Sequence, residues 1–233
     1  MEYREHPPTS ALTAWVACIW ERCDCGGLPV RVIPDGCIDI IWTRGAGTSV
    51  VGANTTAFLV ALPARTHVVG VRLRPGAAPP LIGVDGAVLR DARVPLHELW
   101  GDEGHLLAQR LDETADPGGT LLAALAPRAA AARAPDPLVQ AVVARLQDSA
   151  RPVGELAHEL HVSERQLRRR VGAAVGYGPK RLARVLRLGR ALAAAHAGDE
   201  LARVAADAGY ADQAHFAGDC RELAGVPPSA LLA

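Results

Sequence analysis

Residues 165–190 carry nine positive side chains and no acidic one, and these charges follow a helical pattern. Ser163 stands just before them and suits a helix N-terminus, because its hydroxyl can accept a hydrogen bond from an amide two or three residues later. Leu167 and Val171 lie four residues apart and therefore share one helical face, while most of the arginines point elsewhere. A short helix with an apolar inner face and a guanidinium-rich outer face suits a DNA groove. The alternative is a charged face in contact with water.

A second helical segment comes directly before this basic helix. Residues 153–160 read VGELAHEL, and their valine, leucines and one alanine fall on a single apolar stripe. Only two residues separate this segment from Ser163, which leaves room for a tight turn and nothing longer. Helix, short turn and capped basic helix form the helix-turn-helix pattern of DNA-binding proteins, although other compact helical pairs can imitate it.

The composition limits the other functions that the chain can have. Its 25 basic and 25 acidic residues balance, so any affinity for nucleic acid must come from a local patch. No apolar run approaches the roughly 18 residues that span a bilayer, and the charged N-terminus lacks the apolar core of a secretory signal. Five unevenly spaced cysteines argue for a reducing cytoplasm rather than a disulfide framework. Nothing resembles a Ser/His/Asp triad, a phosphate loop or an H-E-x-x-H motif, so we expect no enzyme.

Short β-branched and aromatic segments separated by turns fill the first part of the chain. The expected strands lie within residues 12–22, 30–33, 37–42, 49–52, 58–62 and 66–73. Such short strands favour a small antiparallel barrel or sandwich. Residues 94–114 have leucines spaced for a helix, which makes the expected fold class of this part α+β. We therefore predict an N-terminal domain over residues 1–115.

Residues 116–137 are rich in alanine, proline and glycine, and we interpret them as a linker with at most a short helix. From residue 138 onward every signal is helical. The segments near 201–224 repeat the pattern seen near 153–172, and a long helix that begins at Gly178-Pro179 joins the two. The sequence thus predicts an all-α domain over residues 138–233 with two helix-turn-helix motifs.

The order of these segments carries a family resemblance. The stretches concerned are LAHELHVSERQLRRRV, the Gly-Tyr-Gly-Pro junction at 176–179, the arginine- and leucine-rich helix after it, and VAADAGYADQAHF followed by GVPPSALL. Together they resemble the DNA-binding domain of the AraC/XylS family of bacterial transcription regulators. IPDGCIDIIW and GVRLRPGAA, in the first domain, resemble less strongly the small sensor domains of some members of that family.

This resemblance implies a sequence-specific, cytoplasmic transcription regulator that binds double-stranded DNA. RNA polymerase and a second copy of the chain are the further partners that it suggests, with no membrane and no cofactor. The N-terminal domain would sense a small-molecule effector or mediate dimerisation. The chain departs from the family at Val171 and Cys220, where an aromatic is usual, and at Gly218, where an arginine is frequent. Because the last departure removes a DNA contact, we expect the first recognition helix to supply most of the sequence readout.

The residues expected to touch DNA come from three helices. Arginines of the first recognition helix would contact guanine edges or adjacent phosphates, since their fork matches two acceptors on one base, and Gln166 could read adenine. Cations of the connecting helix would touch the DNA backbone, or else pair with acids or water, and Arg170 could face either way. The candidates are Ser163, Arg165, Gln166, Arg168, Arg169, Lys180, Arg181, Arg184, Gln213, His215 and Arg221.

Two further groups are candidates in the first domain. Asp39, Arg72, Arg74 and Trp42 could line an effector cavity, or Asp39 and Arg72 could form an internal ion pair that fixes strand register. The second group consists of four cysteines, whose thiolates could bind zinc or copper or sense oxidants, although their spacing is no standard zinc pattern. Ordinary core and turn cysteines are the alternative. A metal- or thiol-responsive sensor and a cysteine-dependent DNA-repair alkyl acceptor therefore remain alternative functions. These cysteines are Cys18, Cys23, Cys25 and Cys37.

Overall fold

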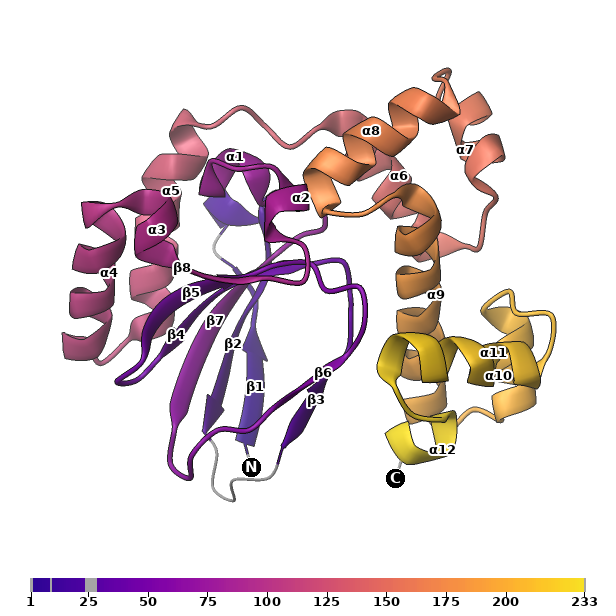
Figure 1. Cartoon of the computed structure of the whole chain (residues 1–233), viewed down its shortest axis with the longest axis horizontal. Coiled ribbons are helices and arrows are strands. Elements are labelled where there is room, and N and C mark those ends of the chain that lie inside the picture. Colours follow the sequence, from indigo (N-terminus) through magenta and orange to yellow (C-terminus); the bar gives the residue numbers. More distant parts are fainter. Residues whose placement is uncertain (1, 9, 24–28, 233) are drawn as a thin grey trace.

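The computed structural model describes every residue except 1, 9, 24–28 and 233. A β-rich N-terminal part is followed by an all-helical C-terminal part, as the sequence predicted (Figure 1). The strands are β1 (Glu2–His6), β2 (Val16–Cys23), β3 (Val30–Val32), β4 (Ile38–Thr43), β5 (Gly47–Val51), β6 (Phe58–Val60), β7 (His67–Leu73) and β8 (Arg93–Pro95). The helices of the N-terminal part are η1 (Ser10–Leu12), α1 (Pro79–Ile82), α2 (Gly86–Leu89), α3 (Leu96–Trp100), α4 (Asp102–Glu113) and α5 (Pro117–Ala131).

The strands form an antiparallel six-stranded sheet in the order β1-β2-β7-β4-β5-β8 and a separate ribbon of β3 and β6. Side chains alternate between the two faces of the sheet. One face, with Ile40, Trp42 and Val71, belongs to the main core and packs against α3, α4 and α5 (Figure 1). The other face carries a smaller buried cluster that includes Cys18 and Trp20. This arrangement is an α+β fold in which helices cover one face of an antiparallel sheet.

The linker prediction for residues 116–137 is wrong, because residues 117–131 form the helix α5. The Asp116 side chain caps this helix by accepting from Gly119 N, and Pro117 stands at its first turn, where no amide is needed. Leu121 and Leu125 are buried in the main core, so packing against the sheet stabilises the helix. The prolines and glycines that suggested a linker lie at the start of the helix and, at Pro127, inside it. Alanine, the strongest helix former, makes up much of the remainder.

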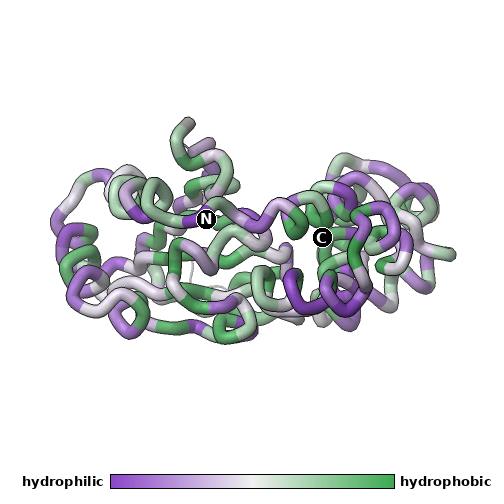
Figure 2. The backbone as a smooth tube through the Cα atoms, turned by 90° about the horizontal axis from the view of Figure 1, so that it is seen from above, coloured by the Kyte–Doolittle hydropathy of each residue, from purple (hydrophilic) through white to green (hydrophobic). Residues whose placement is uncertain are grey.

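The C-terminal part consists of α6 (Pro137–Asp148), α7 (Val153–Glu159), α8 (Glu164–Val175), α9 (Pro179–His196), α10 (Leu201–Asp207), α11 (Gln213–Asp219), η2 (Cys220–Ala224) and α12 (Pro228–Leu231). The predicted helix-turn-helix pairs are α7 with α8 and α10 with α11. Their apolar stripes are buried, as Leu156, Leu167 and Phe216 show. In Figure 2 the two parts of the molecule each carry hydrophobic (green) stretches, and one continuous buried cluster includes residues of both.

The N-terminal part contacts the C-terminal ends of both helix-turn-helix motifs. The helix α2 packs on α8 so closely that a Cβ at Gly86 would lie 2.8 Å from the Ala174 carbonyl oxygen. At the second motif, Ala57 N donates to Leu223 O at 2.7 Å, and Arg31 Nη1 donates to Ala224 O at 2.9 Å. The first domain therefore braces both motifs. Among the described residues, no helix is both long enough and apolar enough to cross a membrane.

Candidate nucleic-acid interface

The first recognition helix, α8, begins with the predicted cap. Gln166 N donates to Ser163 Oγ at 3.2 Å, and Ser163 N donates back to Gln166 Oε1 at 3.1 Å. This reciprocal capping box satisfies two amides at the helix start. Gln166, predicted as an adenine reader, thus uses its side-chain oxygen to accept a hydrogen bond from Ser163 N. Ser163, a predicted DNA contact, is the N-cap of α8.

The exposed face of α8 carries the three arginines predicted to read DNA. Arg165 and Arg169 are exposed and, within the described part of the chain, make no ion pair. Arg168 Nη2 lies 2.8 Å from Glu164 Oε2, but the Arg168 side chain is 67% exposed, so this i,i+4 pair is a weak surface contact. All three guanidinium groups are accessible to a ligand outside the protein.

Arg170, the arginine whose orientation the sequence left open, faces Asp136 at the start of α6. Its Nε donates to Asp136 Oδ2 at 2.7 Å, and its Nη2 bonds the other carboxylate oxygen. The hydrogen bond from Arg170 lowers the pKa of the Asp136 carboxyl. Asp136 also caps α6 by accepting from Leu138 N at 2.9 Å. Arg170 therefore holds the recognition helix α8 against α6, while its side chain remains 37% exposed.

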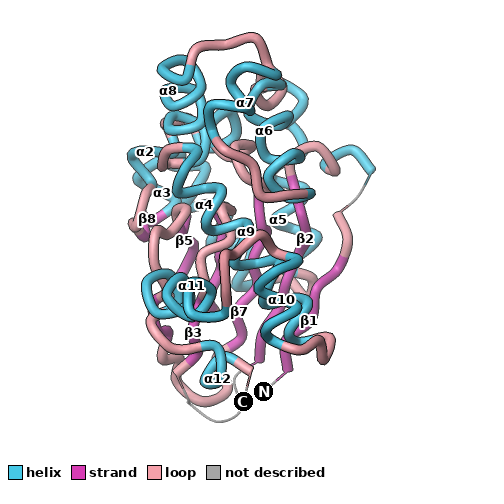
Figure 3. The backbone as a smooth tube through the Cα atoms, turned by 90° about the vertical axis from the view of Figure 1, so that its right-hand side faces the viewer, coloured by secondary structure: helices cyan, strands magenta, loops and turns pink. Residues whose placement is uncertain are grey.

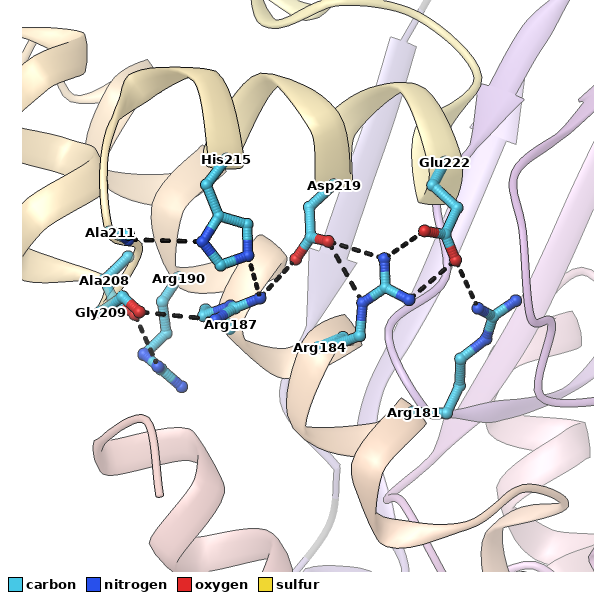
Figure 4. Close-up of polar contacts among 10 residues, drawn as sticks. All are labelled: Arg181, Arg184, Arg187, Arg190, Ala208, Gly209, Ala211, His215, Asp219 and Glu222. Atoms are coloured by element: carbon cyan, nitrogen blue, oxygen red, sulfur yellow. Dashed lines mark hydrogen bonds and ion pairs between the residues drawn. The ribbon is translucent and has the colours of Figure 1, made fainter. Parts of the chain in front are cut away.

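The connecting helix α9 uses its arginines within the protein. Arg181, Arg184 and Arg187 recur every three residues, so they lie on one side of the helix, where they face two carboxylates of the second motif (Figure 4). Arg184 Nη2 lies 2.7 Å from Asp219 Oδ1, and Arg184 Nη1 donates to Glu222 Oε1 at 2.8 Å. Arg181 Nη1 donates to the same Glu222 oxygen at 3.0 Å. The hydrogen bond from Arg184 lowers the pKa of Glu222. We call these five residues the arginine ladder.

Two arginines of α9 also contact the turn of the second motif. The Arg187 guanidinium lies over the Tyr210 ring, 4.1 Å from its centroid, and Arg187 Nη1 donates to Gly209 O at 3.4 Å. Arg190 donates to the carbonyl oxygen of Ala208 (Figure 4). It also donates to the carbonyl oxygen of Leu146. Arg181 and Arg184, predicted as DNA-backbone contacts, are thus already engaged with protein groups. Lys180 is exposed and, among the described residues, has no ion-pair partner.

The second recognition helix, α11, contains no lysine or arginine. Asp212 caps it by accepting from His215 N at 2.7 Å. Gln213 and His215 are exposed on it, and Arg221 is exposed in η2. A Cβ at Gly218 would meet no atom within 4 Å, so this position opens onto free space. The sequence did not reveal that Asp219 is buried, because its acidic residue type suggests a surface position.

A groove separates the two motifs. Its volume is about 860 Å³, and it is lined by residues 150–153 ahead of and at the start of α7, by one side of α9, and by α11 and η2. Four cationic side chains and two carboxylates line it, together with His215. Two of the cationic lining residues, Arg184 and Arg187, are ladder members, whereas the other two, Arg151 and Lys180, are not.

The predicted effector residues do not form a single site. Asp39 and Arg72 are register partners on β4 and β7, with Arg72 Nε 3.6 Å from Asp39 Oδ1, so the internal ion pair is present. Arg72 also contacts Asp35 at 3.3 Å and Glu5 at 3.1 Å. Trp20 Nε1 donates to Asp39 Oδ2 at 3.0 Å. Burial raises the pKa of Asp39 to about 7, and Arg72 opposes that shift only in part.

Trp42 and Arg74 lie elsewhere, which corrects the predicted grouping. Trp42 is 0% exposed in the main core on the opposite face of the sheet, where its Nε1 donates to Asp112 Oδ1 at 3.0 Å. The reason is the strand period of two, which sends residues three apart to opposite faces. Arg74 is exposed beyond the end of β7 and donates to Thr13 O at 2.8 Å.

Among the described residues the cysteines do not form a metal-binding cluster, which was the alternative to ordinary core and turn cysteines. Cys18 and Cys23 lie five residues apart on β2, a span of about 16 Å, which no shared metal ion can bridge. No group of three His, Cys, Asp or Glu residues that could hold a metal exists among the described residues. Burial raises the pKa of the Cys18 thiol to about 11 and raises that of Cys37 as well, which disfavours reactive thiolates. Cys25 lies outside the described residues.

Comparisons with known proteins find one family match in each of the two parts of the chain. Residues 4–95 match a family described as a domain of unknown function (DUF6597), and residues 156–233 match one described as a helix-turn-helix domain. No curated protein matches the sequence. A crystal structure of ToxT from Vibrio cholerae O395 is similar with a TM-score of 0.50 at 10% identity, over 91% of this chain and 95% of that one. A second ToxT structure from Vibrio cholerae has a TM-score of 0.49 at 10% identity, over 100% and 98% of the two chains. At such identity the first likeness shows a shared fold.

Proposed function

We propose that the chain is a DNA-binding transcription regulator with an AraC-type helix-turn-helix domain, in which the first recognition helix reads the DNA sequence while the second mainly docks on the duplex. The single observation that carries this division is the difference in charge between the two helices. The helix α8 exposes Arg165, Arg168 and Arg169, whereas α11 has no cationic residue and an open position at Gly218.

The chemistry of arginine explains why α8 would be the reader. Its planar fork can donate two hydrogen bonds to the two acceptors of a guanine edge in the major groove. Arg165 and Arg169 have no competing carboxylate in the described part of the chain, and Arg168 loses only an exposed pair. On α11, Gln213 and His215 remain as polar groups that can contact bases or phosphates. The sequence preference would therefore be concentrated in one half of the binding site.

The position of the two helices supports simultaneous docking. In Figure 3 the helix α8 lies above α11, and in Figure 1 α8 adjoins the upper end of α9 while α11 lies beside its lower half. The 18 residues of α9 span about 27 Å, which is close to the roughly 34 Å between successive major-groove segments. One subunit would then occupy two successive major-groove segments on one face of the duplex.

Footprinting tests this proposal. The full chain, bound to a duplex selected from a random pool, should protect two segments about one helical turn apart. Replacing Arg165 and Arg169 together by alanine should abolish selection of a preferred sequence. Protection of one segment alone would contradict the tandem arrangement. Equal sequence preference in the two halves of the site would contradict the division between the helices.

The N-terminal domain would respond to an effector through the charged residues around Arg72. Asp35 belongs to the turn that follows β3, and in this turn a Cβ at Gly36 would lie 3.1 Å from Leu182 of α9. A ligand that competes for Arg72 would therefore disturb a turn that touches the DNA-binding domain. Asp39→Ala should abolish an effector response and leave basal DNA binding intact. Equal loss of folding and DNA binding would favour a purely structural ion pair. RNA polymerase and a second copy of the chain remain predicted partners.

A further inference from the structure

The groove between the two motifs contains cations that the ladder does not use. The carboxylates of Asp219 and Glu222 are neutralised by the three ladder arginines. Lys180, at the first turn of α9, has no ion-pair partner among the described residues. Arg151 is 42% exposed, and its partner Glu159 also accepts from Arg145, so the carboxylate is shared between two arginines. The groove therefore presents unsatisfied positive charge to solvent.

The open side of the groove also has free space. Gly218 lines it from α11, and a Cβ there would meet no atom within 4 Å. Ala183 and Pro152 line it with small apolar surfaces. An elongated polyanion can therefore lie along the groove without displacing a bulky side chain, and its charges would come near Lys180 on one wall and Arg151 on the other.

We infer that this groove seats the sugar-phosphate backbone of the DNA strand that runs between the two major-groove segments, with Lys180 and Arg151 as its phosphate ligands. The inference rests on the proposed function, because it needs both motifs to engage one duplex. It adds Arg151, which no sequence motif marked, and it leaves Arg184 and Arg187 as protein-bound groups. Backbone contacts of this kind fix the position of the duplex and carry no sequence information.

Counterion release provides the test, because each phosphate that a cation neutralises steepens the dependence of affinity on salt. The affinity of the full chain for a mixed-sequence duplex of about 40 base pairs is measured between about 50 and 200 mM salt. Lys180→Gln and Arg151→Gln should each reduce the slope of log affinity against log salt by about one, and the double variant by about two. Arg110→Gln is the matched control, because Arg110 is also an exposed arginine but lies on α4 of the N-terminal part.

A second pair of variants tests the same groove by gain of charge. Arginine and glutamate are both better helix formers than glycine, so neither Gly218→Arg nor Gly218→Glu should disrupt α11, and urea denaturation of both variants checks this. Gly218→Arg should raise the affinity for the mixed-sequence duplex and steepen the slope by about one, whereas Gly218→Glu should lower the affinity.

The outcomes separate this inference from the function on which it rests. If Lys180→Gln and Arg151→Gln bind the duplex with the same slope of log affinity against log salt as the wild type, the groove assignment is wrong and the proposed function stands. Equal affinities of Gly218→Arg and Gly218→Glu would lead to the same conclusion. If the wild-type chain does not bind the duplex even at the lowest salt concentration, the proposed function itself fails, and the groove assignment fails with it.

Discussion

Arg187 Nη2 lies 2.7 Å from Asp219 Oδ2, and these side chains are only 16% and 5% exposed. This ion pair, which is largely shielded from water, joins the connecting helix α9 to the second recognition helix α11. Asp219 also accepts from Arg184, so both carboxylate oxygens are used. Because a buried carboxylate is stable only with such partners, the orientation of α11 depends on the ladder.

Replacing Asp219 by asparagine should destabilise the protein. Two guanidinium groups would then lack their shared counter-charge, which we expect to cost on the order of 2 kcal/mol, less than in a fully buried pair because Arg184 is 26% exposed. Urea denaturation measures the loss. Glu222→Gln is the control, because Glu222 is 51% exposed and its removal should cost less than about 1 kcal/mol. Equal losses in the two variants would show that burial of Asp219 has no energetic consequence.

The thiols of Cys18 and Cys37 should react slowly in the folded protein. Their pKa values are raised by burial, so little thiolate exists near neutral pH. Cys23 is exposed and should be labelled by iodoacetamide more than about tenfold faster than Cys18. Peptide mass spectrometry of the labelled chain follows each cysteine separately. Labelling of Cys18 as fast as that of Cys23 would restore the hypothesis of a thiol sensor.

The carboxyl of Asp39 should make stability fall as pH rises. Its pKa is raised from an ordinary value of 3.8 to about 7 in the folded state. Between these values the folded state binds a proton that the unfolded state has released, so the free energy of unfolding decreases with rising pH in this window. Arg72, Asp35 and Trp20 surround the carboxyl and contribute to the net shift.

The variant Asp39→Asn isolates this effect, because asparagine cannot ionise. The difference in the free energy of unfolding, variant minus wild type, should grow from about pH 4 to pH 7 and then stay constant. Urea denaturation of both proteins at several pH values gives this difference, in which the other titrating groups cancel. A difference that shrinks with rising pH would mean that Arg72 holds the pKa of Asp39 below its ordinary value.

The repeating local patterns of this chain could be predicted from sequence. The cap at Ser163, the buried stripe with Leu167 and the two helix-turn-helix pairs follow from spacing alone, and the structure confirms them. The α5 helix could not be predicted in this way, because its stability comes from Leu121 and Leu125 packing on a distant sheet. Tertiary packing here outweighed the local signal of proline and glycine.

The candidate site was predictable only in its exposed part. The arginines of α8 are placed by the helix period, whereas the partners of Arg184 come from residues 35 and 38 positions later in the chain. A sequence pattern cannot show that Asp219 and Glu222 face α9, since this depends on how α11 packs. For the same reason Arg151 carried no signal, because its relation to the groove exists only after both motifs have folded.

Arg31 should stabilise the end of η2, which follows the second recognition helix α11. Its Nη1 donates to Ala224 O. A Cβ placed on Gly225 would lie 3.1 Å from Arg31 Nη1. Removing this charged hydrogen bond in Arg31→Gln should cost about 1–2 kcal/mol locally. Hydrogen exchange should then accelerate over residues 220–226, while Arg65→Gln, at an exposed turn, leaves these amides unchanged. Unchanged exchange in Arg31→Gln would show that the contact does not brace the motif.

Replacing Arg168 by alanine should change DNA recognition, whereas replacing Arg184 by alanine should change stability. Arg168 is exposed on α8 and is proposed to read a base, so Arg168→Ala should lose roughly 1–3 kcal/mol of affinity for a selected duplex and relax the preference at one position. Arg184 is bound to Asp219 and Glu222, so Arg184→Ala should lower the unfolding midpoint and leave the salt slope of DNA binding unchanged. Affinities for selected and scrambled duplexes across a salt series, with urea denaturation of each variant, separate the two. If Arg168→Ala weakens both duplexes by the same factor, Arg168 is not a base reader. A smaller salt slope in Arg184→Ala with unchanged stability would mean that Arg184 leaves the ladder to bind a phosphate.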